Sequence, residues 1–171
     1  WLASKIRANE NQPSFCRSGA SNVYARYFPL ERGTKQIAVY DPRSDQMVLI
    51  DTCFTTDHND FAEDIDDSLY FGEYGSGVLG WINTRAWDET HDEEASQGWC
   101  PGVLDTNGDG VITPGWTEPE EPVDPSRDHR ITFGCYSVAS DPDGIAWCTG
   151  LTGPGQLVRV DRGPNPPETC K

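Results

Sequence analysis

The sequence predicts an all-β protein, and more specifically a β-propeller fragment of about two to three antiparallel blades with a long acidic calcium-binding insertion. Three observations predict this class. The chain of 171 residues contains 17 glycines and 13 prolines, a composition typical of a turn-rich protein. Hardly any segment repeats its apolar residues at helical spacing. Segments 36–52, 61–83 and 136–161 instead read as short strands separated by turn signals.

These three segments differ in size but share one plan. Residues 36–52 favour two strands around the Asp41-Pro42 turn. Residues 61–83 predict a strand, an acidic turn, a strand, a glycine-rich turn and a third strand. Residues 136–161 repeat that order, with Ala62, Asp64, Asp66, Leu69 and Tyr70 recurring as Ala139, Asp141, Asp143, Ala146 and Trp147. A chance resemblance between two β-meanders is the alternative.

The repeats divide the chain into four parts. Residues 1–55 form a partial blade, 56–84 a blade, 85–130 an acidic insertion and 131–171 a further blade. We expect the blades at 61–83 and 136–161 to be consecutive and antiparallel, with Trp81 and Trp147 inside the sheet packing. Within the insertion a short helix could start near Thr90, and the remainder is predicted to be loop because it carries four prolines between 114 and 125.

The insertion contains the strongest motif of the chain, D-T-N-G-D-G-V-I-T from Asp105 to Thr113. It matches the first half of an EF-hand-type calcium loop, in which oxygen side chains at alternate positions converge on one cation. The candidate ligands are Asp105, Asn107, Asp109 and the carbonyl of Val111. An Asp/Asn/Gly turn that binds nothing is the alternative interpretation.

The motif departs from an EF-hand at its end. The twelfth position, where a bidentate acidic residue is expected, is Trp116, and Pro114 and Gly115 interrupt any exiting helix. A later carboxylate must therefore close the site. Glu118 is the first choice, followed by Glu120, Glu121 and Asp124.

Charge excludes several partners. Thirteen basic and 28 acidic residues give a net charge of −15, which disfavours nucleic acid and anionic membrane surfaces. No apolar stretch approaches the roughly 20 residues that span a bilayer. The expected partners are calcium and either the rest of the protein's own propeller or other protein chains.

Evidence for an enzyme is weak. The chain has no G-x-S-x-G, Walker A or G-x-G-x-x-G motif. His58 lies among Asp57, Asp60, Glu63 and Asp64, which is compatible with an acid–base or metal cluster, although a solvated turn is the favoured interpretation. The motifs lean against an enzyme, and if the protein is one, it is a lyase-type propeller.

Six cysteines, at positions 16, 53, 100, 135, 148 and 170, are even in number, widely spaced and without a C-x-x-C pair. This pattern favours disulfides and an oxidising compartment, so we expect a periplasmic or extracellular protein. Unpaired buried thiols in a cytosolic protein are the alternative. Because the chain begins at Trp1, either a leader was removed or this is a piece of a longer protein.

Residues 61–83 and 136–161 resemble blades of the virginiamycin B lyase-like (streptogramin lyase-type) propellers, with a P-D-G turn at Pro142, Asp143 and Gly144. Over nearly its full length the chain is similar to bacterial exported carboxypeptidase regulatory-like domain-containing proteins. Phrases such as FPLE, LIDTCF, FAED, DTNG and NPPET carry that likeness. The resemblance implies a propeller and export, and the first four residues would continue a strand of a preceding blade.

The resemblance also bears on the disulfides. Cys16 and Cys53 fall where the likeness is densest, and we expect them to pair. Cys135 and Cys148 flank one turn and are the favoured second pair, although a regular hairpin register places them on opposite faces. That choice leaves Cys100 with Cys170.

A lyase of this type would use a histidine before the blade and a glutamate that closes its second strand. The histidine positions fall on Asn59 and Tyr136, and the glutamate positions on Glu73 and Gly150. Only half of the pair is present. The expected function is therefore an exported, calcium-stabilised propeller used for binding or assembly. The alternatives are a lyase- or lactonase-like enzyme with a divalent ion in its channel, and a surface-layer or filament subunit.

Overall fold

The computed structural model describes residues 1–6, 12–33, 35–72, 75–151 and 155–171. Their secondary structure is mostly β, which confirms the all-β class. The helical elements are a 3₁₀ turn at Ser14–Cys16 and two short helices, α1 (Val23–Tyr27) and α2 (Thr84–Thr90). The strands pair antiparallel in several small open sheets, and no closed barrel forms within the described ranges.

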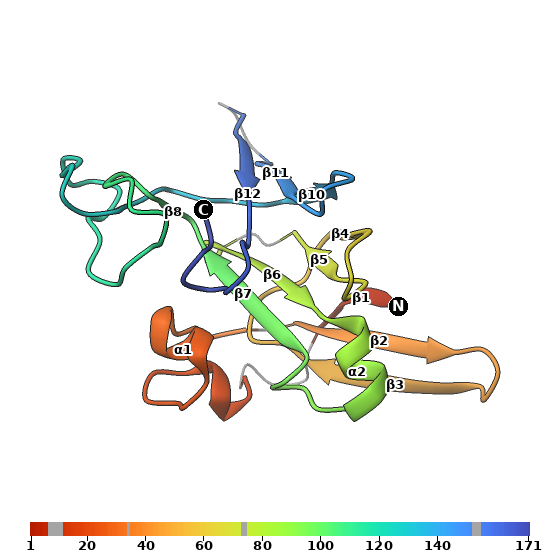
Figure 1. Ribbon diagram of the computed structural model, residues 1–171. Coiled ribbons are helices and arrows are strands. Elements are labelled where there is room, and N and C mark those ends of the chain that lie inside the picture. The colour runs from red at the N-terminus through yellow and green to blue at the C-terminus, as the bar shows by residue number, and fades with distance from the viewer. Residues whose placement is uncertain (7–11, 34, 73–74, 152–154) are drawn as a thin grey trace.

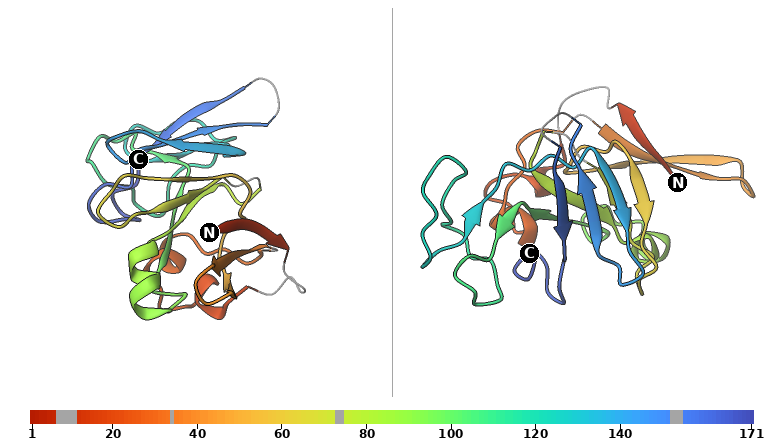
Figure 2. Two further views of the ribbon diagram at one scale, coloured as in Figure 1. Left: turned by 90° about the vertical axis from the view of Figure 1, so that its right-hand side faces the viewer. Right: turned by 90° about the horizontal axis from the view of Figure 1, so that it is seen from above.

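Three larger sheets follow one another in space as they do in the sequence (Figures 1 and 2). The first has the order β1 (Leu2–Ile6), β2 (Lys35–Asp41), β3 (Gln46–Asp51). The second has the order β4 (Asn59–Phe61), β5 (Leu69–Phe71), β6 (Val78–Ile82), β7 (Gln97–Pro101). The third has the order β10 (Ser137–Ser140), β11 (Ala146–Thr149), β12 (Leu157–Val160). A two-stranded ribbon of β8 (Val103–Leu104) and β9 (His129–Arg130) joins the second and third sheets along the chain.

The second sheet is the middle layer and is buried on both faces. Alternate residues point to opposite sides of a strand, so Leu69, Phe71, Val78, Ile82 and Trp99 enter one core with the first sheet. Their neighbours Tyr70, Leu79, Trp81 and Cys100 enter the other core with the third sheet. This double burial explains why β5 and β6 read as nearly continuous apolar runs. The left view of Figure 2 shows the three layers edge-on.

Close packing in the first core depends on a missing side chain. A Cβ atom added to Gly80 would lie 2.3 Å from ring atoms of Phe54, which is fully buried. The ring of Phe54 also lies near that of Phe71, with centroids 5.9 Å apart. Gly80 therefore lets the first and second layers approach each other.

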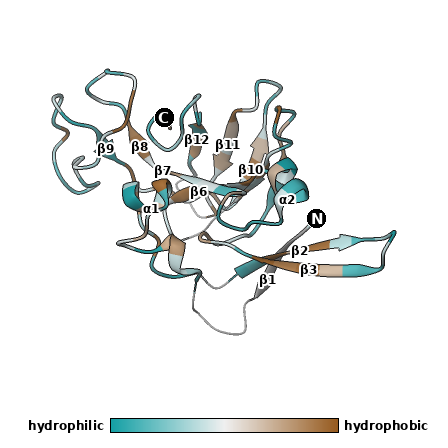
Figure 3. Ribbon diagram, turned by 60° about the horizontal axis from the view of Figure 1, so that its bottom comes forward, coloured by the Kyte–Doolittle hydropathy of each residue, from teal (hydrophilic) through white to brown (hydrophobic). Residues whose placement is uncertain are grey.

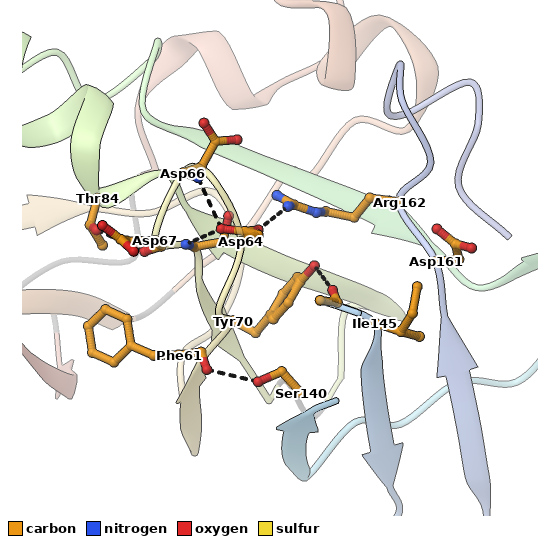
Figure 4. Close-up of polar contacts among 12 residues, drawn as sticks. Phe61, Asp64, Asp66, Asp67, Tyr70, Thr84, Ser140, Ile145, Asp161 and Arg162 are labelled. Atoms are coloured by element: carbon orange, nitrogen blue, oxygen red, sulfur yellow. Dashed lines mark hydrogen bonds and ion pairs between the residues drawn. The ribbon is translucent and has the colours of Figure 1, made fainter. Parts of the chain in front are cut away.

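The two predicted repeats form the same kind of turn, and Figure 4 shows the earlier one, at Asp64 to Asp67. Asp64 Oδ1 accepts hydrogen bonds from the backbone N–H groups of Asp66 and Ser68, and a left-handed residue, Asp67, follows at φ 47°. In the later repeat Asp141 Oδ1 accepts from the N–H groups of Asp143 and Ile145. Gly144 takes the left-handed position there at φ 76°. Both segments thus contain three antiparallel strands in the expected order, with the expected first turn. Parts of their glycine-rich second turns, at 73–74 and 152–154, lie outside the described residues, and the assignment of the segments as propeller blades stays a prediction.

The prediction for the two tryptophans is half right. Trp81 is buried between the second and third sheets. Trp147 is only half-buried and lies on the opposite face of β11, because its neighbours Ala146 and Cys148 face the core. Its indole N–H donates to Asp141 Oδ2 at 2.8 Å. The tryptophan therefore supports the turn instead of the sheet packing.

The prediction that residues 85–130 are mostly loop is wrong for residues 85–101. Helix α2 ends at Thr90 instead of starting there, because Asn83 caps its N-terminus by accepting from Ala86 N–H and His91 adopts the left-handed C-cap. Residues Gln97–Pro101 then form β7, a strand of the second sheet. From β8 to β9 the remaining chain forms loops that project to one side (Figure 1).

The structure contains three disulfides, Cys16–Cys53, Cys100–Cys170 and Cys135–Cys148. These are the expected pairings. The register objection to Cys135 and Cys148 is removed by a bend at Tyr136, which precedes β10 and breaks the regular alternation. Cys135 therefore reaches the buried face of Cys148.

Candidate functional site

The loop at 105–113 is folded around its own oxygen side chains. Asp105 accepts hydrogen bonds from Gly108 N–H at 2.7 Å and from Gly110 N–H at 3.0 Å. Asn107 Oδ1 accepts from Asp109 N–H, and Asp109 Oδ1 accepts from Val111 N–H, both at 3.0 Å. The two glycines have positive φ angles, 76° and 88°, which glycine adopts without steric cost. The predicted ligand residues therefore lie on one tight loop.

The exit of this loop is anchored in the protein. Ile112 is fully buried in the second core, and its N–H donates to the carbonyl of Glu168 at 2.8 Å. Thr106 Oγ1 donates to the carbonyl of Arg127 at 2.5 Å, and Thr113 N–H donates to Asp128 Oδ2 at 2.7 Å. In the sequence, Asp128 is only one of many acidic residues of the insertion. Both ends of the loop are thus fixed to residues 127–128.

Three of the four acidic residues chosen to close the site, Glu118, Glu121 and Asp124, have other contacts. Glu118 Oε2 forms an ion pair with Arg130 at 2.9 Å, and Glu118 N–H donates to Glu121 Oε2. Asp124 Oδ1 accepts from the N–H and hydroxyl of Ser126. The backbone hydrogen bond from Ser126 lowers the pKa of Asp124. These side chains therefore take part in turns and ion pairs of the insertion.

Carboxylates from three segments act electrostatically on the hydroxyl of Tyr27. Burial, the largest cause, and the charges of Glu168, Asp128 and Asp109 together raise the pKa of Tyr27 to about 12. Across the described ranges, no three His, Cys, Asp or Glu side chains form a group that could hold a metal ion. An EF-hand-type site also draws on amide and backbone carbonyl oxygens, which Asn107 and Val111 offer in this loop.

A second polar cluster lies between the second and third sheets and centres on Arg162 (Figure 4). Its guanidinium pairs with Asp64 Oδ2 at 2.5 Å and lies over the rings of Tyr70 and Trp81, 5.2 and 4.9 Å from their centroids. Tyr70 donates its hydroxyl to the carbonyl of Gly144 at 2.9 Å. Burial raises the pKa of Tyr70 to about 12. Each of these contacts joins one sheet or turn to the next, which is a structural role.

A cleft of about 490 Å³ opens beside this cluster. Tyr24 and Trp81 contribute aromatic surface to it, and Asp66, Glu94 and Arg162 contribute charge. Nothing in the sequence pattern indicated it, because its walls come from helix α1, strands β6 and β7 and the C-terminal segment.

The residues around His58 do not form the acid–base or metal cluster considered from the sequence. Asp57 pairs with Lys35, Asp60 accepts from the N–H and hydroxyl of Ser140, and Asp64 pairs with Arg162. His58 itself lies edge-on to the ring of Tyr136, with centroids 4.9 Å apart. Three of the four acidic residues, Asp57, Asp60 and Asp64, thus have separate structural partners.

The positions compared with a lyase lie at strand boundaries. Asn59 begins β4, and Tyr136 immediately precedes β10. Gly150 follows β11. Glu73 lies outside the described residues. The two positions where a histidine would be required are occupied by an asparagine and a tyrosine.

The first sheet presents apolar side chains to solvent. Met47 pairs across the hairpin with Tyr40, and Leu49 pairs with Ala38, so Tyr40, Met47 and Leu49 share one face. They are 42 %, 59 % and 41 % exposed. Strand β3 is also an edge of its sheet in the described residues. In Figure 3 the end of this hairpin is hydrophilic, and its hydrophobic part lies nearer the body.

Comparisons with protein-family models, with curated proteins and with solved structures found no match. Among the helices that the structure describes, none combines the length and the apolar character needed to cross a bilayer. Functional inference therefore depends on the chain's own residues and contacts.

Proposed function

We propose that the chain is an exported, calcium-stabilised β-propeller module used for binding or assembly. The observation that carries the calcium assignment is the loop at 105–113. Its three oxygen side chains, those of Asp105, Asn107 and Asp109, have EF-hand spacing, and its exit is fixed by buried Ile112. Three disulfides support export.

The role of the ion would be structural. The insertion collects many carboxylates, and a divalent cation would offset their mutual repulsion. Calcium suits the site better than magnesium, which requires a tight octahedron and keeps several of its waters. The ion would order residues 100–128 against the second core.

Calcium should raise the stability of chelator-treated protein. Extracellular modules bind calcium with Kd values down to about 10⁻⁴ M, so about 10 mM calcium would add about 2.7 kcal/mol. For a chain of this size that corresponds to a Tm increase of roughly 5–11 °C. Differential scanning calorimetry measures the increase, and limited proteolysis should show calcium-dependent protection within 100–128.

Two variants control this experiment. Asp105→Ala should abolish both the Tm increase and the protection, because Asp105 is the first ligand of the loop. Glu89→Gln removes an exposed carboxylate of helix α2 and should respond to calcium as the wild type does. Identical Tm values and cleavage patterns with and without calcium would show that the motif is only a turn that binds no calcium.

The binding or assembly part of the proposal depends on the apolar strip of Tyr40, Met47 and Leu49. An exposed apolar edge strand is a typical site for pairing with another chain. We infer that the strip packs against a second copy of this chain, as in a filament or surface-layer subunit.

Sedimentation velocity over a range of concentrations tests the strip. The wild type should self-associate, and Leu49→Lys should shift it to monomer. Since Leu49 is partly exposed, the Tm should change little. A wild type that stays monomeric at millimolar concentration would refute self-assembly through this face. No observation favours the lyase alternative over this account.

A further inference from the structure

The calcium loop lacks its own closing carboxylate. In an EF-hand-type loop that begins at Asp105, position 9 is Thr113 and position 12 is Trp116. Positions 9 and 12 have the three-residue spacing of a capping box, in which the later acidic side chain accepts a hydrogen bond from the earlier residue's backbone N–H. The carboxylate of a glutamate at position 12 can therefore coordinate the ion and also accept a hydrogen bond from the N–H of position 9. Tryptophan can do neither.

Asp128 accepts the hydrogen bond that a position-12 glutamate would accept. Its Oδ2 receives the N–H of Thr113 at 2.7 Å. The preceding residue, Arg127, is fixed against position 2 of the loop, because its carbonyl accepts from Thr106 Oγ1. Asp128 itself is 2 % exposed. Its carboxylate is therefore held in place beside the loop, although it lies far along the chain.

The second oxygen of this carboxylate supplies an independent observation. Asp128 Oδ1 is buried and has no hydrogen-bond partner among the residues that the structure describes. An unsatisfied buried acceptor is costly, and native proteins rarely retain one without a function. A bound cation would satisfy it.

Glu118, the closing residue expected from the sequence, has the opposite properties. It is about half exposed, and its carboxylate pairs with Arg130 at 2.9 Å. To bind calcium it would have to leave this ion pair. Asp128 has no such ion pair to leave, but its carboxylate would have to move closer to those of Asp105 and Asp109, because the three do not form a metal-holding group in the described residues as they stand.

From these contacts we propose that Asp128, and not Glu118, supplies the closing carboxylate of the calcium site. This inference rests on the proposed calcium loop. The site would then comprise Asp105, Asn107, Asp109, the Val111 carbonyl and Asp128, with water completing six to eight oxygens. One ion would tie β8, through its loop, directly to the residue that precedes β9.

Calcium titration by isothermal calorimetry of the wild type, Asp128→Asn and Glu118→Gln tests the assignment. Asp128→Asn retains an acceptor for Thr113 N–H but removes the charge, so calcium affinity should fall at least tenfold. Glu118→Gln removes the partner of Arg130 and should leave affinity within twofold of the wild type. Near-UV circular dichroism should establish that both variants are folded.

Thermal melts with and without calcium distinguish a calcium ligand from an aspartate that only stabilises the fold. In chelator, Asp128→Asn should melt at or above the wild-type Tm, because a neutral amide replaces a buried charged acceptor. In 10 mM calcium the order should reverse. Wild-type affinity in Asp128→Asn, or lost affinity in Glu118→Gln, would overturn the assignment while leaving the calcium loop intact. Absence of calcium binding by the wild type would overturn both.

Discussion

Replacing Cys100 and Cys170 together with alanine should lower the free energy of unfolding by about 4 kcal/mol. The two residues are 70 positions apart, and the chain-entropy estimate for a loop of that length lies between about 3 and 4.7 kcal/mol. Both are almost fully buried. The bond attaches the C-terminal segment, which receives the hydrogen bond from Ile112 N–H, to the middle sheet.

Guanidinium unfolding of the oxidised protein measures this loss, with the Cys135→Ala, Cys148→Ala double variant as the matched control. That bond spans only 13 positions and should contribute about 3 kcal/mol. The first variant should also bind calcium more weakly, because the segment that supports the loop exit is released. A larger loss for the short loop than for the long one would contradict the entropic account.

The second large effect is expected at Trp99. Its side chain is fully buried in the first core, its ring centroid lies 5.2 Å from that of Tyr24, and its indole N–H donates to the carbonyl of Phe28 at 2.8 Å. Trp99→Ala should cost about 4 kcal/mol, since truncating a buried tryptophan costs about 3–5 kcal/mol. The carbonyl of Phe28 would also lose its donor.

Trp147→Ala is the control for Trp99, because Trp147 is half-buried on an outer face. Its loss should be about 1–2 kcal/mol, in keeping with partial burial. Urea unfolding at constant calcium compares the two. Equal losses of unfolding free energy in the two variants would contradict the placement of Trp99 in the core between the first and second sheets.

The hairpins could be predicted from the sequence because their signals are local. Asp64 and Asp141 each accept two backbone N–H groups within the next four residues, and such turns are visible as short acidic and glycine patterns. Much of the acidic excess has this origin: Asp41, Asp92, Asp124 and Asp161 also accept backbone N–H groups. The net charge therefore reflects turn construction as well as the candidate ion site.

Strand β7 could not be predicted in this way. Its residues include Gly98 and Pro101, and because both of its faces are buried it has no alternation to recognise. Gly98 is required by packing, since a Cβ atom there would lie within about 2.6 Å of ring atoms of Trp81 and Tyr24. Strand β7 pairs with β6, from which helix α2 separates it in sequence. This pairing depends on tertiary contacts and not on a local sequence signal.

Only the local part of the candidate site could be predicted from the sequence. Asp105, Asn107 and Asp109 are neighbours in sequence and could be identified together. Asp128 reads as one member of an acidic run, and only the approach of residues 127–128 to Thr106 and Thr113 distinguishes it. Glu118 was favoured by proximity in sequence, whereas its pairing with Arg130 depends on the fold.

Direct calcium binding tests the central claim most closely. Isothermal titration of chelator-treated wild type and Asp109→Ala, in buffer of physiological ionic strength, gives the stoichiometry and the affinity. The account predicts one calcium ion per chain with a Kd on the order of 10⁻⁴ M, and loss of that binding in Asp109→Ala. Absence of saturable heat in the wild type, or binding of equal strength in the variant, would contradict it.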